Sequence, residues 1–144
     1  MKLKQIMSTE VRTIAPGTPV SRAAEIMRMA NIGYLPVVVE EDEIVGVVTD
    51  RDLVVRAITG DKDPRRVLAR EVMTPEPRTM NQNASVCDAV TLMRNNRIRR
   101  ILVVDDDEML AGVVTLTDVA LRAHEPIQSG TALLSICAQP ALVG

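Results

Sequence analysis

The stretch GVVTDRD, residues 46–52, returns as GVVTLTD at residues 112–118, with five of its seven letters unchanged. The two copies are 66 residues apart, since 112 − 46 = 66. Residues 6–53 can be placed on residues 72–119 at this offset without a gap, and 16 of the 48 paired positions are then identical. Average composition would give roughly one identity in fifteen. The chain is therefore a tandem duplication.

Each copy contains a segment with the spacing of an amphipathic helix. In the first copy Thr18 is the expected N-cap and Pro19 the first helical residue, positions that these residue types favour. Apolar residues follow at i, i+3, i+4 and i+7, which places them on one helix face. They are Val20, Ala23, Ala24 and Met27 in the first copy, and Val86, Ala89, Val90 and Met93, after Ser85, in the second.

Two apolar runs joined by an acidic turn follow each helix. In the first copy LPVVV (residues 35–39) and IVGVVT (residues 44–49) flank the turn EEDE, and in the second ILVV and LAGVVT flank DDDE. Such runs predict a buried hairpin. A short strand, RTIA or RTMN, is expected before each first helix, and a second helix directly after Thr49 and Thr115. The repeating unit is thus strand, helix, strand, strand, helix.

The expected domain organisation follows from this duplication. The first repeat takes residues 1–59, a linker rich in Gly, Pro and charge takes residues 60–70, the second repeat takes residues 71–122, and an apolar tail takes residues 123–144. A half of roughly 60 residues cannot cover both faces of an apolar sheet alone. We expect an α/β fold of the α+β type, in which two β-α-β-β-α repeats pack about a pseudo-twofold axis.

Composition argues against several functional classes. A net charge of −2 does not suit a general nucleic-acid binder, which needs excess Lys and Arg. No apolar run reaches the roughly 20 residues that span a bilayer, and the N-terminus lacks the apolar core of a secretory signal. We therefore expect a cytoplasmic protein without membrane contact. Cys87 and Cys137 are expected to be reduced and buried, and His124, the only His, is a poor basis for a metal site.

The chain resembles CBS-domain pairs, also called Bateman modules, over about residues 4–122. The resemblance rests on IMSTEVRTI and VMTPEPRTM at the start of each copy, on IGYLPVV and IRRILVV at the middle strand, and on the G-x-x-T-x-x-D phrase in register in both copies. It implies a stand-alone regulatory module for AMP, ADP, ATP or S-adenosylmethionine, with no required cofactor, no catalytic or metal site, and an effector protein of unknown identity as a partner.

In that family a site combines the T-x-x-D of one repeat with the first and middle strands of the other. The Asp takes the ribose hydroxyls, and the Thr hydroxyl lies near the phosphates. The resemblance therefore implies two crossed sites in this chain. One would use Thr49, Asp52, Thr79, Met80, Arg99 and Arg100, and the other would use Thr115, Asp118, Thr13, Ile14, Gly33 and Tyr34. The arginine-containing site should favour phosphorylated ligands, because a guanidinium binds phosphate well.

Other interpretations stay open. T-x-x-D is also a capping-box pattern, so the chain could be a structural dimerisation module with empty sites, and its arginines could be surface charge. A divalent ion could sit at the acidic turns. An enzyme is not expected: IMP dehydrogenase contains a similar segment, but its barrel needs about 250 residues. No nucleophile–base pair or paired-carboxylate cleft is evident either.

A homodimer is also expected. The helices after T-x-x-D have apolar positions that we predict to face outward and to form a patch larger than monomers tolerate. These positions are Leu53, Val54, Ile58, Val119 and Leu121. The family's dimer is a flat disc joined through helices, and the tail around Leu133, Leu134 and Ile136 is expected to pack on that interface.

Overall fold

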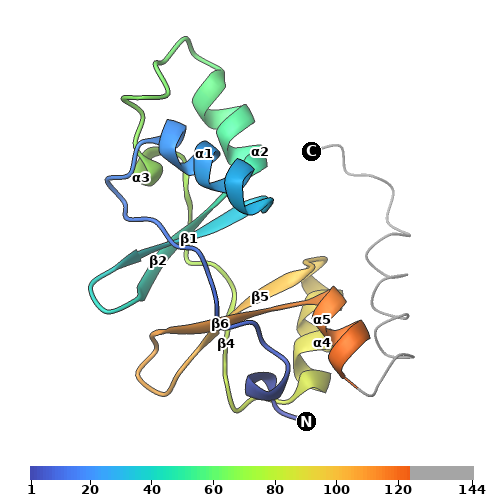
Figure 1. Cartoon of the computed structure of the whole chain (residues 1–144). Coiled ribbons are helices and arrows are strands. Elements are labelled where there is room, and N and C mark those ends of the chain that lie inside the picture. The colour runs from blue at the N-terminus through green and yellow to red at the C-terminus, as the bar shows by residue number, and fades with distance from the viewer. Residues whose placement is uncertain (124–144) are drawn as a thin grey trace. The chain divides into compact units, whose positions relative to one another are not determined.

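The helix and hairpin predicted for each repeat are present. The chain divides into two compact units, and the helix and hairpin of each repeat lie together in one of them (Figure 1). The structure is a computed structural model, and it describes residues 1–123. Unit 1 contains Met1–Val11 together with the chain from Arg78 onward, and unit 2 contains Arg12–Pro77. Unit 2 thus holds the hairpin of the first repeat, and unit 1 holds that of the second.

Unit 2 is built on a three-stranded antiparallel sheet in the order β1-β2-β3. Its strands are β1 (Tyr34–Val39), β2 (Glu43–Thr49) and β3 (Thr74–Pro75). Its helices are α1 (Val20–Ala30), α2 (Asp50–Asp52), which continues as the π-helical segment η2 (Leu53–Ile58), and α3 (Ala69–Val72). The core lies between the helices and the strands, and its residues Leu35, Val37 and Val48 are fully buried.

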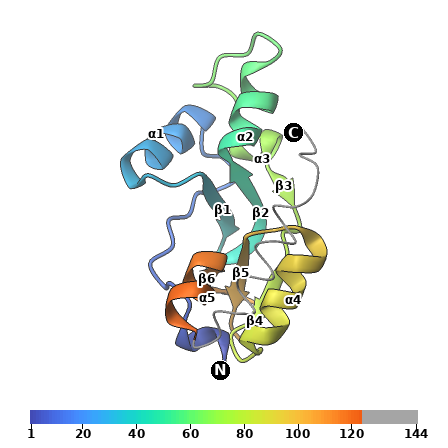
Figure 2. The same ribbon diagram turned by 90° about the vertical axis from the view of Figure 1, so that its right-hand side faces the viewer.

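Unit 1 has a mixed sheet in the order β4-β5-β6, with β4 parallel to β5 and β5 antiparallel to β6. Its strands are β4 (Thr79–Asn81), β5 (Arg100–Val104) and β6 (Leu110–Thr115). Its helices are η1 (Leu3–Gln5), α4 (Val86–Asn96) and α5 (Leu116–Arg122). α4 packs beside β5 and α5 (Figure 2), and Met93, Ile101 and Val114 are fully buried in the core.

The segment that leads into each repeat belongs to the unit of the other repeat. We call residues 1–9 and 67–75 the leading segments; they correspond at the offset of 66. In unit 1, Leu3 and Ile6 are 0% and 1% exposed in the core, and Ser8 exchanges two backbone hydrogen bonds with Val113. In unit 2, β3 of the second leading segment pairs with β2. Each sheet and core is therefore completed by a segment from outside its own repeat.

The first helix begins one residue later than predicted. Pro19, in extended conformation, is the N-cap of α1, and the Thr18 hydroxyl accepts from the Ala15 N–H at 3.1 Å instead of capping the helix. Ile26 is buried, whereas Ala24 is exposed. The buried face of α1 therefore contains Ile26 in place of the predicted Ala24. The corresponding helix of the second repeat, α4, begins as predicted: the Ser85 hydroxyl caps it by accepting from the Asp88 N–H at 3.0 Å.

The two predicted first strands differ from each other. RTMN forms β4, but RTIA contributes only a single parallel bridge between Ile14 and Val37. Pro16 follows closely and has no N–H with which to extend the pairing. Ile14 nevertheless joins the sheet, because its N–H donates to the Pro36 carbonyl at 3.0 Å and its carbonyl accepts from the Val38 N–H at 2.9 Å.

Three further predictions of burial were wrong. Cys87 is exposed, because it lies about 100° around α4 from the buried Val86. Leu53 and Val119 were expected to face outward, but they are 9% and 0% exposed in the two cores. His124, Cys137 and the tail residues Leu133, Leu134 and Ile136 lie outside the described residues. Among residues 1–123, no helix is long and apolar enough to cross a membrane.

Candidate functional site

In unit 2 two reciprocal hydrogen bonds between Thr49 and Asp52 close the turn from β2 into α2. The Asp52 N–H donates to the Thr49 hydroxyl at 3.1 Å, and the Thr49 N–H donates to Oδ2 of Asp52 at 2.9 Å. This is the capping box that the T-x-x-D pattern predicts. Asp52 is only 8% exposed, so the capping bonds hold its carboxylate in a sheltered position.

Unit 1 repeats this geometry at Thr115 and Asp118. The Asp118 N–H donates to the Thr115 hydroxyl at 3.1 Å, and the Thr115 N–H donates to Oδ2 of Asp118 at 2.8 Å. The Thr115 hydroxyl also lies 2.7 Å from the same Oδ2. In both units, therefore, the threonine contacts one carboxylate oxygen, and Oδ1 accepts none of these bonds.

β1, the middle strand of the first repeat in chain order, begins beside this turn. Tyr34 lies opposite Thr49 in the β1–β2 pairing, and the Gly33 carbonyl accepts from the Asp50 N–H at 2.9 Å. A Cβ atom added to Gly33 would lie 2.7 Å from Oδ2 of Asp50, so a larger side chain would force the carboxylate away. Because this carboxylate ends an exposed side chain that can turn away, the approach of the strand to the turn does not itself require a glycine here.

The equivalent positions of unit 1 hold arginines. Arg100 lies opposite Thr115 in the β5–β6 pairing, and the Arg99 carbonyl accepts from the Leu116 N–H at 2.9 Å. Both arginine side chains are exposed. The structure therefore brings Arg99 and Arg100 to the start of β5, next to the Thr115 turn of the same unit.

The predicted first-strand residues occupy different surroundings. Thr13 is half-buried, and Ile14 lies in the core of unit 2 at 5% exposure. Thr79 is exposed and lies opposite Leu102 in β5, whereas Met80 packs against the core of unit 1. The side chains of Ile14 and Met80 thus serve the packing of their own units.

The two crossed sites of the sequence analysis each draw on both units. Thr49 and Asp52 belong to unit 2, while Thr79, Met80, Arg99 and Arg100 belong to unit 1; the other set is divided in the opposite sense. Within one unit, the structure brings the T-x-x-D turn together with the middle strand of the same repeat. The assembly of the crossed sets stays a prediction.

Sequence reasoning missed two arginines that lie against the carboxylates. Nε of Arg56 is 3.9 Å from Oδ1 of Asp52, and Nη1 of Arg122 is 3.6 Å from Oδ1 of Asp118. A signal for them was present, because 122 − 56 = 66 is the offset of the repeat. Arg56 lies just beyond residues 6–53 and Arg122 just beyond residues 72–119, the two stretches that align at this offset.

The two repeats that contain the T-x-x-D turns match a known domain. The sequence profile of the CBS domain matches residues 3–58 and 69–125, which is most of the chain. The chain belongs to the CBS-domain family. The uncharacterized protein MK0525 of Methanopyrus kandleri is 39% identical over 111 residues, and the match covers 75% of this chain and 57% of that protein. The CBS domain-containing protein YhcV of Bacillus subtilis is 36% identical over 137 residues, covering 95% and 96% of the two chains.

Solved structures share the fold of this CBS-domain pair. One is CBSX2 in complex with AMP, with 26% identity and a TM-score of 0.72, covering 83% of this chain and 93% of the other. Another is the CBS domain pair of protein MJ0100 in complex with 5′-methylthioadenosine and S-adenosyl-L-methionine, with 28% identity, a TM-score of 0.72, and coverage of 83% and 97%. The architecture is thus the mixed α/β fold of CBS pairs.

The enzyme considered in the sequence analysis is also a relative of this CBS-domain pair. The IMP dehydrogenase of Methanocaldococcus jannaschii is 34% identical over 125 residues. These residues cover 87% of this chain but only 24% of the dehydrogenase. The likeness therefore concerns a minor part of that enzyme.

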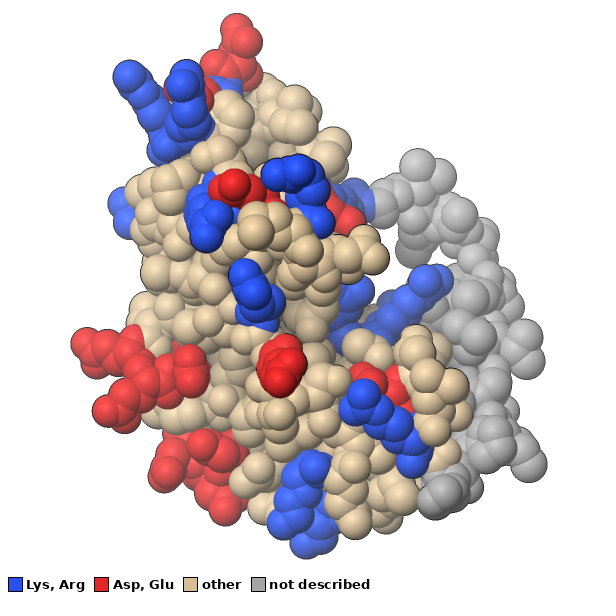
Figure 3. All heavy atoms as spheres, in the orientation of Figure 1, with Lys and Arg blue, Asp and Glu red and all other residues tan. Residues whose placement is uncertain are grey.

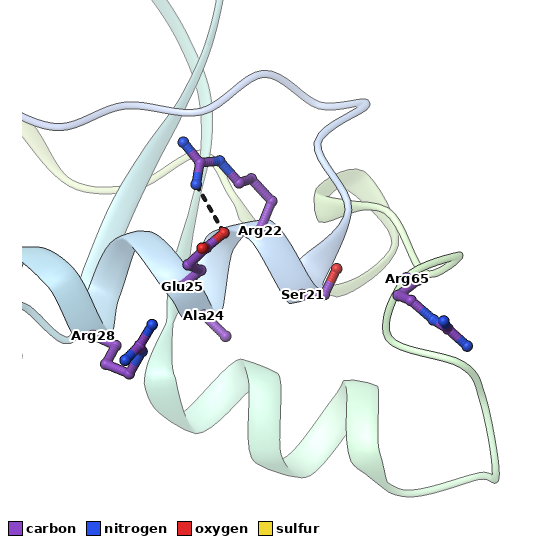
Figure 4. Close-up of a pocket in the computed structure, with 6 residues that line it drawn as sticks. All are labelled: Ser21, Arg22, Ala24, Glu25, Arg28 and Arg65. Carbon is purple, nitrogen blue, oxygen red and sulfur yellow. Dashed lines mark hydrogen bonds and ion pairs between the residues drawn. The ribbon is translucent and has the colours of Figure 1, made fainter.

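An open groove of about 690 Å³ runs along α1 of unit 2 and contains none of the predicted site residues. It is lined by Ser21, Arg22, Ala24, Glu25, Arg28 and Arg65 (Figure 4). Arg22 pairs with Glu25 at 2.8 Å, and Arg65 donates to both carboxylate oxygens of Asp63 at 3.2 Å. The side-chain hydrogen bond from Arg65 lowers the pKa of Asp63 below its ordinary value. Because two of its arginines are already paired, the groove is a charged surface rather than a prepared site.

The acidic turns lie at the tips of the two hairpins (Figure 3). Their exposed residues are Glu40, Glu41, Asp42 and Glu43 in unit 2, and Asp106, Asp107 and Glu108 in unit 1. In the described part of the chain, no three His, Cys, Asp or Glu side chains gather as metal ligands would. The Asp106 carboxylate accepts from the Asn81 side-chain amide at 3.0 Å, and all of these residues are exposed, which suits hairpin turns.

Proposed function

We propose that this CBS-domain pair is a regulatory module that binds adenosine-containing nucleotides, namely AMP, ADP, ATP or S-adenosylmethionine. The observation that carries the proposal is the duplicated turn. In each copy the threonine N–H donates to Oδ2 of the aspartate, Asp52 or Asp118, and not to Oδ1. Complexes of CBSX2 with AMP and of the MJ0100 pair with S-adenosylmethionine support the ligand class. The output of such a module would be a change in an effector protein.

The chemistry of ribose recognition suits these carboxylates. A ribose presents two neighbouring hydroxyl groups, each of which can donate a hydrogen bond, and an ionised carboxylate is a pure acceptor with about four lone-pair positions. The Asp52 and Asp118 side chains are only 11% and 13% exposed. A hydrogen bond made in such a sheltered position competes less with water than one made at the surface.

We further propose that the two sites are crossed and unequal. Thr49 and Asp52 would act with Thr79, Met80, Arg99 and Arg100, and Thr115 and Asp118 with Thr13, Ile14, Gly33 and Tyr34. A guanidinium can bind phosphate through two parallel hydrogen bonds. The Asp52 site should therefore prefer ADP or ATP over adenosine, whereas the Asp118 site should be less sensitive to phosphate.

Replacing Arg99 and Arg100 by Ala tests this asymmetry. We expect ATP to bind at least tenfold more weakly to the Asp52 site, because a charge-assisted hydrogen bond contributes roughly 1.5–3 kcal/mol. Adenosine should bind almost as before, and the salt dependence of ATP binding should decrease. Isothermal titration calorimetry with both ligands measures the difference. Equal losses for ATP and adenosine, or no loss for ATP, would show that these arginines are surface charge.

A thermal-melt screen against the four nucleotides tests the proposed function itself. A ligand that binds only the folded chain adds about 2.7 kcal/mol of stability at 100 times its Kd. The matched control is the Asp52→Asn/Asp118→Asn protein, which keeps an oxygen for the capping bond. The proposal fails if millimolar concentrations of all four compounds leave the wild-type transition unchanged.

The second candidate is a structural dimerisation module with empty sites. Its supporting observation is the capping box, because helix capping alone accounts for both Thr49 and Asp52, and for Thr115 and Asp118. The two candidates give opposite results in the melt screen. Dimerisation without any nucleotide response would favour the structural module.

A further inference from the structure

Arg122 of unit 1 contacts two different parts of that unit. Its Nη1 lies 3.6 Å from Oδ1 of Asp118, and the same nitrogen donates a hydrogen bond of 3.0 Å to the Ile6 carbonyl. Ile6 is the C-cap of η1, where carbonyl groups have no helical partner. The arginine therefore connects the T-x-x-D carboxylate to the end of the short helix in the first leading segment.

Arg56 makes the same connection in unit 2. Its Nε lies 3.9 Å from Oδ1 of Asp52, and its Nη1 donates to the carbonyls of Val72 at 3.2 Å and Met73 at 3.4 Å. α3 ends at Val72, with Met73 as its C-cap.

All three parts of this connection correspond at the offset of 66 between the repeats. Asp52 corresponds to Asp118, Arg56 to Arg122, and Val72 to Ile6. The residues between the aspartate and the arginine nevertheless differ, LVV in one copy and VAL in the other. The aspartate, the arginine and the carbonyl acceptor are thus retained in both copies of the duplication, although the residues between the aspartate and the arginine differ.

We propose that Arg56 and Arg122 are positioning residues that couple the ribose-binding carboxylates to the leading segments. The proposal rests on the proposed nucleotide function for its ligand, and it adds a route by which occupancy of a site reaches residues 1–9 or 67–75. The arginine lies on the Oδ1 side of the carboxylate at ion-pair distance, while the threonine N–H donates a hydrogen bond to Oδ2. A ribose that bonds to this carboxylate then also orders the arginine and the carbonyls that it contacts.

A purely structural alternative is that the arginines only cap η1 and α3, the short helices of the leading segments. Arginine side chains commonly bond the last carbonyls of a helix. In that case, replacing them would weaken the fold but would not distinguish ligands that have ribose hydroxyls from ligands that lack them. Both arginine side chains are 51% exposed, so replacing them by glutamine opens no cavity.

The first arm of the test uses the ligand-free protein. Amide hydrogen exchange of Met7 and Ser8, which donate to the Leu3 and Val113 carbonyls, is compared in wild type, Arg122→Gln and Asp118→Asn. We expect roughly fivefold faster exchange in both variants, the factor that corresponds to one ordinary hydrogen bond. The control is Arg94→Gln, which changes an exposed arginine of α4. Coupling is disproved if exchange in Arg122→Gln or in Asp118→Asn matches that in the control.

The second arm compares ATP with 2′,3′-dideoxy-ATP, which lacks both ribose hydroxyls. In Arg56→Gln/Arg122→Gln we expect ATP to bind roughly five- to tenfold more weakly, while 2′,3′-dideoxy-ATP changes by less than about twofold. The control is Arg28→Gln/Arg94→Gln, another pair of exposed arginines related by the offset of 66.

The outcomes separate the two proposals. Equal losses for ATP and the dideoxy compound would assign the arginines a capping role only and overturn the coupling. If wild type bound neither ATP nor any other adenosine compound, the proposed function would fail. The exchange measurements would in that case still decide whether the carboxylate, the arginine and the leading segment form one network.

Discussion

At the scale of single residues, Asp52 and Asp118 have one structural role and one proposed binding role. Oδ2 of each accepts the threonine N–H that closes the capping box, at 2.9 and 2.8 Å. Oδ1 faces an arginine and is the oxygen that we assign to a ribose. Because the two roles use different oxygens, a substitution can separate them.

Replacing Asp52 and Asp118 by Ala should weaken nucleotide binding at least tenfold at each site. The physical reason is the loss of a charge-assisted contact of roughly 1.5–3 kcal/mol. Calorimetry with ATP and AMP gives the measurement. Asp88→Asn is a matched control, since Asp88 occupies the same N3 position in α4 after the Ser85 cap and is exposed. If the doubly substituted protein bound nucleotide as tightly as wild type, the residue assignment would be wrong.

At the scale of elements, a glycine lets each leading segment lie against the second strand of a hairpin. A Cβ atom on Gly112 would lie 2.7 Å from the Ser8 carbonyl oxygen and 2.9 Å from Sδ of Met7. On Gly46 it would lie 3.0 Å from the Thr74 carbonyl and 2.6 Å from Sδ of Met73. The contact at Gly112 involves backbone most severely, and backbone moves less easily than the end of a methionine.

Gly112→Ala should therefore destabilise the protein by about 1–3 kcal/mol, the usual cost of an overpacked position. Gly46→Ala should cost less, because the methionine sulfur can move aside. Gly17→Ala is the control: a Cβ there meets nothing within 4 Å, and a surface change of this kind stays within about 0.5 kcal/mol. Urea unfolding measures all three. Equal midpoints for Gly112→Ala and Gly17→Ala would contradict the need for close approach.

At the scale of the whole molecule, several large apolar side chains remain exposed on the helices. Met29, Val54 and Ile58 of unit 2 are 67%, 57% and 67% exposed, and Leu121 of unit 1 is 79% exposed. A monomer rarely leaves a continuous apolar patch of many such side chains in water. Exposed side chains of this size are candidates for an interface, and the homodimer stays a prediction.

We expect light scattering at tens of micromolar to give the mass of two chains. Val54→Asp/Ile58→Asp should shift the protein to a monomer, because charges at a buried interface carry a large desolvation cost. The variant should keep its circular dichroism spectrum, since both side chains are exposed in the single chain. A wild-type protein that ran as a monomer would contradict this prediction.

The sequence by itself determined the features that depend on neighbours along the chain. Hairpin strands follow from the apolar runs, and the Thr49–Asp52 and Thr115–Asp118 capping boxes follow from i, i+3 spacing, so both were predictable. The offset of 66 revealed the duplication and pointed to the family. Local spacing did not decide whether Ala24 or Ile26 lies on the buried face of α1.

Only the tertiary structure decided which unit each leading segment completes. Leu3 and Ile6 are fully buried beside strands more than 90 residues away, since Ile6 packs in the same core as Ile101 (101 − 6 = 95). It also turned Leu53 and Val119 inward and brought Arg122 to the Ile6 carbonyl. These contacts join residues that no local spacing relates. They form because each half-sheet is too small to bury its own apolar surface and takes the missing strand or helix from the neighbouring repeat.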